Sequence, residues 1–107
     1  MAWLFLVTAG LFEVAMAYSL KMSEGFSHLW WAASFLLFAV LSFGLLATAL
    51  KSLEVGTAYA VWTGIGAVGT AILGMIVLGD DFSLLKVGSI ALILVGVVGL
   101  NLAGAGH

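Results

Sequence analysis

The stretch that decides the fold is LWWAASFLLFAVLSFGLLATAL, residues 29–50, which contains no ionisable side chain. A helix needs about 20 residues to cross the hydrocarbon core of a bilayer, because it rises about 1.5 Å per residue. Trp30 and Trp31 stand near its first end, and tryptophan is enriched at membrane interfaces. The stretch therefore predicts one membrane-spanning helix.

Three further apolar runs of similar length occupy most of the remaining chain, at residues 2–20, 57–78 and 84–103. The short polar segments KMSEGFSH, KSLEVG and GDDFS separate the four runs. Inside lipid a backbone must satisfy its own hydrogen bonds, which favours helices. We predict an all-α integral membrane protein, with four transmembrane helices in a single membrane domain over residues 1–107.

The composition excludes several classes of protein. Only 7% of the 107 residues are charged and 64% are hydrophobic, whereas a soluble domain carries about 25% charged residues. The chain has no cysteine and a net charge of -2, so neither a thiolate metal site nor a nucleic-acid partner is expected. No nucleophile–base pair, metal cluster or phosphate-binding loop is present. We expect no enzyme activity, no cofactor and no bound metal, with membrane lipid as the surroundings.

The distribution of lysines does not predict a single orientation of the chain in the membrane. Short loops make neighbouring helices antiparallel, so Lys51 lies on one side and Lys21 and Lys86 on the other. The positive-inside rule counts such residues, and here the two sides nearly tie. One interpretation is a weakly biased protein that inserts one way. The other is dual topology, in which oppositely inserted copies pair as an antiparallel homodimer.

The glycines predict close contacts between helices. The chain has 14 glycines and no proline, and small residues let membrane helices approach one another. Gly64 and Gly66 weaken one turn of the third helix, a candidate bend. The fourth helix combines small and branched residues that suit a contact between subunits, although an internal contact is equally compatible. These residues are Gly88, Ile93, Gly96 and Val97.

Glu13 is the only Asp, Glu, Lys, Arg or His side chain among the first twenty residues. It lies about 17 Å from the start of its helix, near the middle of the bilayer. A charge there costs about 2.5 kcal/mol or more, and such residues mark ion or substrate pathways. No Lys or Arg lies at a comparable depth, so the carboxylate holds either a proton or a cation. The alternative is a protonated acid with one hydrogen bond inside a packed bundle.

The residues around Glu13 predict a pocket. Gly10, Met16 and Ala17 share its helix face, where Gly10 leaves space beside the carboxylate and Met16 offers an adaptable wall. Tyr59, Trp62 and Thr63 share a face of the third helix with Gly66. Tyr59 is a candidate donor to the carboxylate, and Trp62 is a candidate ring face for a cation. Ser42 is the most plausible deep polar group of the second helix.

The stretches AGLFEVAMAYSLKMSEGF, VGTAYAVWTGIGAVG and GSIALILVGVVGLNL resemble the small multidrug resistance family of bacterial inner-membrane exporters. The resemblance covers the whole chain and its loop positions. It implies an antiparallel, dual-topology homodimer that exchanges protons for small organic cations by alternating access. The shared site is then Glu13, with Tyr59 and Trp62 beside it and with Gly10 and Ser42 supporting it. The fourth helices carry the dimer contact.

The resemblance leaves the substrate subtype open. Trp62-Thr63-Gly64-Ile65-Gly66 looks like the guanidinium-exporting branch of the family. That branch typically has Trp where this chain has Met16. It often has Lys where this chain has Asn101, and Pro where this chain has Glu54. The quaternary-ammonium branch usually has a smaller residue at the position of Met16, and Asn near the position of Asn101. We expect a tolerant pocket that accepts guanidinium, substituted guanidinium and hydrophobic ammonium ions.

Three other functions compete with the exporter interpretation. A broad quaternary-ammonium multidrug exporter fits the features of the second branch. A structural membrane subunit explains the glycines but not a mid-membrane Glu13 near Tyr59 and Trp62. A proton or cation channel explains the acid, although large aromatic side chains suit occlusion better than continuous conduction.

Overall fold

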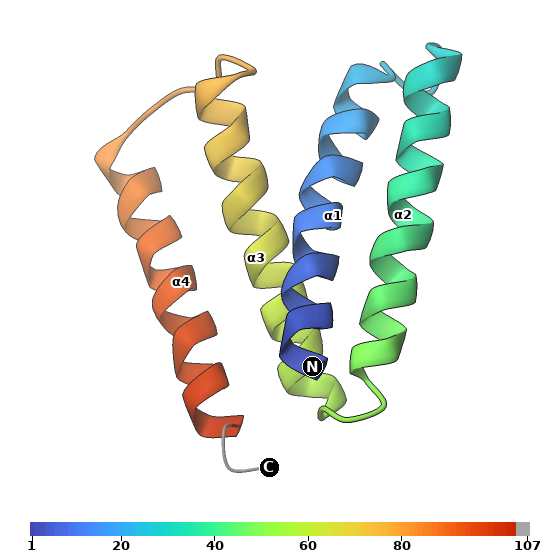
Figure 1. The fold of residues 1–107 in the computed structure, drawn as a ribbon. Coiled ribbons are helices and arrows are strands. Elements are labelled where there is room, and N and C mark those ends of the chain that lie inside the picture. Colours follow the sequence, from blue (N-terminus) through green and yellow to red (C-terminus); the bar gives the residue numbers. More distant parts are fainter. Residues whose placement is uncertain (105–107) are drawn as a thin grey trace.

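Four helices follow one another in an up-and-down order (Figure 1). The computed structural model describes residues 1–104, with helices α1 (Ala2–Met22), α2 (Leu29–Ala49), α3 (Val55–Ile76) and α4 (Leu84–Gly104), and no strand in that part of the chain. All four are long and apolar enough to cross a membrane. The predicted all-α membrane fold is confirmed.

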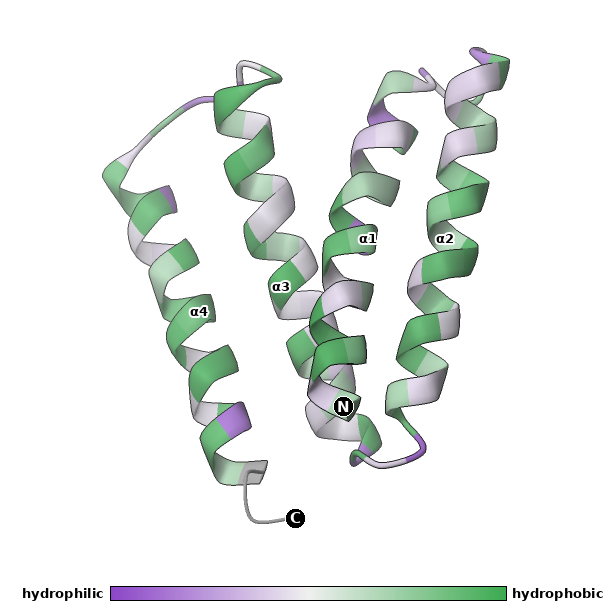
Figure 2. Cartoon of the chain, in the orientation of Figure 1, coloured by the Kyte–Doolittle hydropathy of each residue, from purple (hydrophilic) through white to green (hydrophobic). Residues whose placement is uncertain are grey.

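The helix ends differ slightly from the expected ones. α3 begins at Val55 and ends at Ile76, two residues earlier at each end than the apolar run suggested. α1 continues to Met22, and Lys21 in its last turn interacts favourably with the carboxyl end of the helix dipole. Hydrophilic residues lie mainly in the loops, whereas the helices are mostly hydrophobic (Figure 2).

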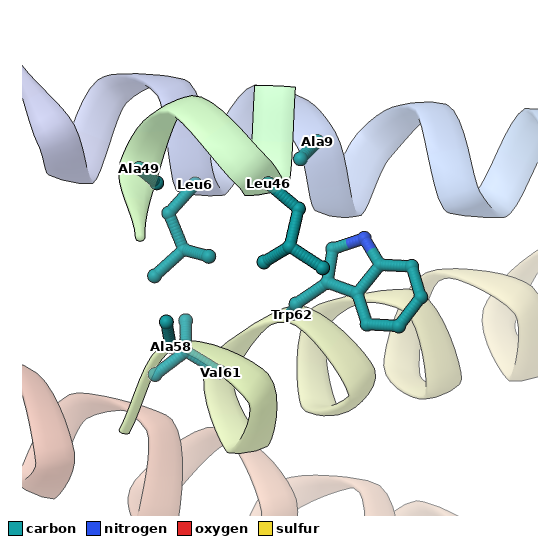
Figure 3. Packing of buried hydrophobic residues seen from close by; sticks show 7 residues of the cluster. All are labelled: Leu6, Ala9, Leu46, Ala49, Ala58, Val61 and Trp62. Atoms are coloured by element: carbon teal, nitrogen blue, oxygen red, sulfur yellow. The ribbon is translucent and has the colours of Figure 1, made fainter. Parts of the chain in front are cut away.

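The helices pack in the order α2, α1, α3, α4, so α1 and α3 lie in the middle (Figure 1). α1 packs against α2 and α3, and α4 packs against α3 alone. A buried cluster joins the first three helices near the α2–α3 loop (Figure 3). Its members are Leu6, Ala9, Leu46, Ala49, Ala58, Val61 and Trp62. α4 adds no buried residue to this cluster, and most of its surface is uncovered in the single chain.

Candidate functional site

The Glu13 side chain on α1 lies against Gly66 on α3. A Cβ atom built on Gly66 would overlap the Oε1 and Cδ atoms of Glu13 and lie 2.9 Å from its Cγ. The Oε1 atom is buried and has no hydrogen-bond partner among the described residues. The two helices therefore hold the Glu13 carboxyl group between them without a hydrogen bond to its buried oxygen.

The same α1–α3 contact uses two other glycines. A Cβ on Gly69 would overlap Val14, and a Cβ on Gly10 would lie 2.7 Å from the Cγ2 atom of Ile65. Side chains of α1 thus enter glycine positions of α3, and a side chain of α3 enters one of α1. We expected Gly10 to leave space beside the carboxylate, but Ile65 fills that space. Gly66, expected as a bend residue on the helix face that carries Tyr59 and Trp62, accommodates Glu13.

A hydrogen-bonded chain fixes the helix turn that precedes Glu13. The Trp62 indole N–H donates to the Ser42 hydroxyl at 2.9 Å, and that hydroxyl donates to the Ala9 carbonyl at 2.7 Å. Ser42 is fully buried and Trp62 is 5% exposed. In an α-helix the Ala9 carbonyl also accepts the backbone N–H of Glu13. The chain therefore joins α3, α2 and α1 just below the carboxylate.

The aromatic side chains form a cluster on α2 and α3. The ring of Trp62 lies 5.2 Å from that of Phe43 and 5.6 Å from that of Tyr59, centre to centre. Tyr59 is 57% exposed and lies about 10 Å along α3 from Gly66. No hydrogen bond joins Tyr59 to the buried Oε1 atom of Glu13, and the Trp62 N–H donates to Ser42. The ring face of Trp62 as a site for a cation stays a prediction. The Thr63 hydroxyl donates to the Tyr59 carbonyl of its own helix at 2.9 Å.

Met16 and Ala17 follow Glu13 on α1 and are both half-buried. They lie one turn further toward the α1–α2 loop, on the face that the sequence analysis assigned to the pocket. A hollow of about 400 Å³ lies between α3 and α4 and includes Ala71 and Ser89 in its lining. Glu13 does not line it. A second hollow, of about 210 Å³ and lined by Trp3 and Val97 among others, does not include Glu13 either.

The glycines of α3 and α4 divide between two environments. A Cβ on Gly64 would lie 2.8 Å from Val97 and 3.5 Å from Ile93, so these residues join α4 to α3 inside the chain. Gly88 and Gly96 have open space where a side chain would stand. α3 is a continuous helix through Gly64 and Gly66. The bend and the contact between subunits stay predictions.

The site has one candidate chemical group. No cluster of three His, Cys, Asp or Glu side chains that could hold a metal occurs within residues 1–104. Neither α2 nor α3 contains an Asp, Glu, Lys or Arg. Glu13 is therefore the single charged group that the first three helices bring to mid-membrane, and it can bind a proton or a small cation.

Comparison with known proteins gives the family. The family model described as Small Multidrug Resistance protein matches residues 1–93. A guanidinium exporter of Yersinia pseudotuberculosis is 57% identical over 103 residues, which cover 96% of this chain and 99% of the relative. Guanidinium exporters of Escherichia coli and Proteus vulgaris are 50% and 46% identical over the same length, covering 96% of this chain and 98% and 99% of themselves.

These matches confirm the resemblance stated from the sequence. They also agree with four helices that are apolar enough to cross a membrane. The chain belongs to the small multidrug resistance family and is a multi-pass protein of the bacterial inner membrane, and the relatives described above are named guanidinium exporters.

Proposed function

We propose that this protein exports guanidinium ions in exchange for protons, and that the two ions compete for the carboxylate of Glu13. The observation that carries the proposal is the buried Glu13 Oε1 atom, which has no partner among the described residues. An isolated acid at this depth is costly for a structural role, since an apolar side chain would pack there without penalty. Competition for one group couples the two ions without any further charged residue.

The chemistry of guanidinium matches that of a carboxylate. A guanidinium ion is planar and offers parallel N–H donors to both carboxylate oxygens, which makes a charge-assisted pair. Relatives that are 46–57% identical over 96% of this chain carry the name guanidinium exporter. When the ion binds, Glu13 is ionised; when a proton binds, the charge that holds the ion is removed.

We infer that an antiparallel homodimer encloses the site. The hollows of about 400 and 210 Å³ do not include Glu13, and a second copy placed against α1–α3 closes the site. A side chain at Gly88 or Gly96 of α4 would meet no other atom of the chain. Leu92 and Val95 beside them are 73% and 67% exposed. Small and branched residues of this kind suit contact between membrane helices. We assign them to the dimer contact, whereas Ile93 and Val97, which were also expected there, already lie against Gly64 of α3.

Alternating access follows from two copies inserted in opposite orientations. Each copy contributes one Glu13, so exchanging the conformations of the two subunits converts an inward-open site into an equivalent outward-open one. Gly64 and Gly66 are the assigned bend residues because glycine weakens a helix by about 1 kcal/mol relative to alanine. Release of the cation on the outside then accompanies proton binding to Glu13.

The expected substrate range is wider than guanidinium alone. Met16 lies one turn from Glu13 and is unbranched, flexible and polarisable. Such a side chain rearranges around substituents of different shapes. We therefore include substituted guanidinium ions and hydrophobic quaternary ammonium ions among the substrates.

Transport by purified protein in liposomes tests the proposal. An imposed guanidinium gradient should drive proton movement in the opposite direction, and Glu13→Gln should abolish it. Glu24→Gln is the matched control, because Glu24 is exposed in the α1–α2 loop and pairs with His28 at 3.0 Å. Coupled exchange that persists in Glu13→Gln contradicts the proposal. Proton flux that needs no guanidinium gradient favours a channel instead.

A further inference from the structure

The position of Gly66 has a chemical consequence for Glu13. We call the space left by the missing side chain of Gly66, into which the Glu13 carboxyl group projects, the Gly66 notch. Gly66 is buried, and the Oε1 atom of Glu13 is buried with it. Any side chain larger than hydrogen at position 66 would occupy the same volume as the carboxyl group.

The Gly66 notch offers no donor to a charged carboxylate. Backbone N–H groups of a continuous helix are used by carbonyls four residues earlier. The Trp62 N–H is used by Ser42, and the Thr63 hydroxyl by the backbone of α3. An ionised carboxylate buried without donors or a counter-charge is strongly disfavoured, whereas a neutral carboxyl group is tolerated.

Within one subunit, the other titratable groups of the helices around Glu13 make no contact with its buried oxygen. α2 has no titratable side chain, and α3 has only Tyr59, about 10 Å along the helix from Gly66. On α1 the other groups are the amino terminus, Tyr18 and Lys21, of which Lys21 lies about 12 Å along the helix from Glu13. α4, which carries Lys86, packs on α3 and not on α1.

We propose that the Gly66 notch is a binding site for the protonated form of Glu13, which the side chain leaves when it ionises and binds guanidinium. Gly66 is then a positioning residue. The protonated and the cation-bound forms of Glu13 differ in the position of the side chain as well as in its charge, so one form excludes the other. On cation binding the carboxyl O–H bond breaks, the proton passes to water, and the carboxylate rotates out and pairs with the ion. This inference rests on the exchange function proposed above.

The test compares Gly66→Ala with Gly69→Ala. Both add one methyl group to the same contact between α1 and α3, but the methyl group at position 69 meets Val14 and not an acid. The measurement is guanidinium binding by calorimetry over a pH series, with purified protein in detergent. Its readout is the pH at which binding is half-maximal.

The two variants should differ in this pH. Without the notch the protonated form loses its site, so Glu13 releases its proton more readily and guanidinium binds at lower pH. In Gly66→Ala the half-maximal pH should fall by about one unit, which is tenfold in proton affinity. In Gly69→Ala it should stay as in the wild type, whatever happens to stability. Equal values in both variants, or a rise in Gly66→Ala, overturn the proposal.

A shorter acid gives an independent check. In the Glu13→Asp background the carboxyl group is one methylene nearer to α1 and does not fill the notch. Adding Gly66→Ala there should move the half-maximal pH by much less than it does with Glu13, a non-additivity expected of two groups in contact. A full shift in that background counts against the notch.

The unaltered protein allows a measurement that does not depend on folding of a variant. Infrared difference spectra between neutral and acidic pH, with the Glu13→Gln spectrum subtracted, report the C=O stretch of the protonated acid. We expect it at the high-frequency end of the carboxylic-acid range, typical of a carbonyl without a hydrogen bond. A frequency typical of a hydrogen-bonded acid overturns the notch. If Glu13→Gln abolishes exchange while these tests fail, only the notch is wrong.

Discussion

Ser42 on α2 donates a hydrogen bond of 2.7 Å to the carbonyl of Ala9 on α1, one turn before Glu13. A serine in a membrane helix commonly bonds to its own backbone, as Thr48 does to Gly44 at 2.9 Å. Ser42 instead bonds across the contact between α1 and α2, and it also accepts the N–H of Trp62. One hydroxyl thus holds three helices in register near the carboxylate.

Replacing Ser42 with alanine should lower stability more than removing an ordinary hydroxyl. The variant Ser42→Ala loses both hydrogen bonds and leaves the buried N–H of Trp62 without an acceptor, at a cost of about 1–2 kcal/mol. Thr48→Ala on the same helix removes a hydroxyl that bonds only to its own backbone and should change stability little. Thermal unfolding in detergent measures both. A loss as large in Thr48→Ala contradicts the special role of Ser42.

The variant Trp62→Phe distinguishes the contribution of the indole N–H to stability from that of the aromatic ring. Phenylalanine keeps an aromatic ring against Phe43 and removes the donor to Ser42, so we expect a loss of about 1 kcal/mol. Because the two residues share one hydrogen bond, the double variant with Ser42→Ala should cost less than the sum of the single changes. The same unfolding assay measures the cycle. Strict additivity would mean that the 2.9 Å hydrogen bond contributes nothing.

Gly64→Ala should loosen α4. The added methyl group would lie 2.8 Å from the Cγ2 atom of Val97, and overpacking of this kind costs about 1–3 kcal/mol. Gly44→Ala on α2 is the control, because it has open space. Spin labels on α3 and α4 should report a longer distance in Gly64→Ala, and Val97→Ala should restore the original distance. An unchanged distance contradicts the assigned contact.

The proposed competition predicts how transport depends on pH. Lowering the pH on the side that binds guanidinium protonates Glu13 and should raise the half-saturating guanidinium concentration. The rise should be at most tenfold per pH unit for each proton displaced, without loss of maximal rate at saturating guanidinium. Rates in liposomes at several pH values measure this. A lower maximal rate with an unchanged half-saturation point would indicate that the proton acts elsewhere.

The sequence predicts the helices well because charge marks their ends. Lys51 and Glu54, and Asp80 and Asp81, bound the apolar runs, and the depth of Glu13 follows from counting along its helix. The contact between Glu13 and Gly66 is different. Membrane helices are apolar on most faces, so hydrophobic periodicity does not identify the face that packs inward. Which glycine of α3 meets which side chain of α1 depends on crossing geometry, and this explains why Ile65, unexpectedly, fills the space at Gly10.

Met16 offers the sharpest test of substrate range. Met16→Trp replaces a flexible side chain, one turn from Glu13, by a rigid ring with an N–H donor. The ring should orient a small planar ion and exclude bulky substituents. We therefore expect guanidinium transport to be kept or improved, and transport of a tetraalkylammonium ion to fall about tenfold, close to the effect of one misfitting group in a pocket. Ala33→Trp on an exposed position of α2 controls for adding a tryptophan. Equal loss of both substrates in Met16→Trp would show that the residue supports the fold and not the selection of substrate.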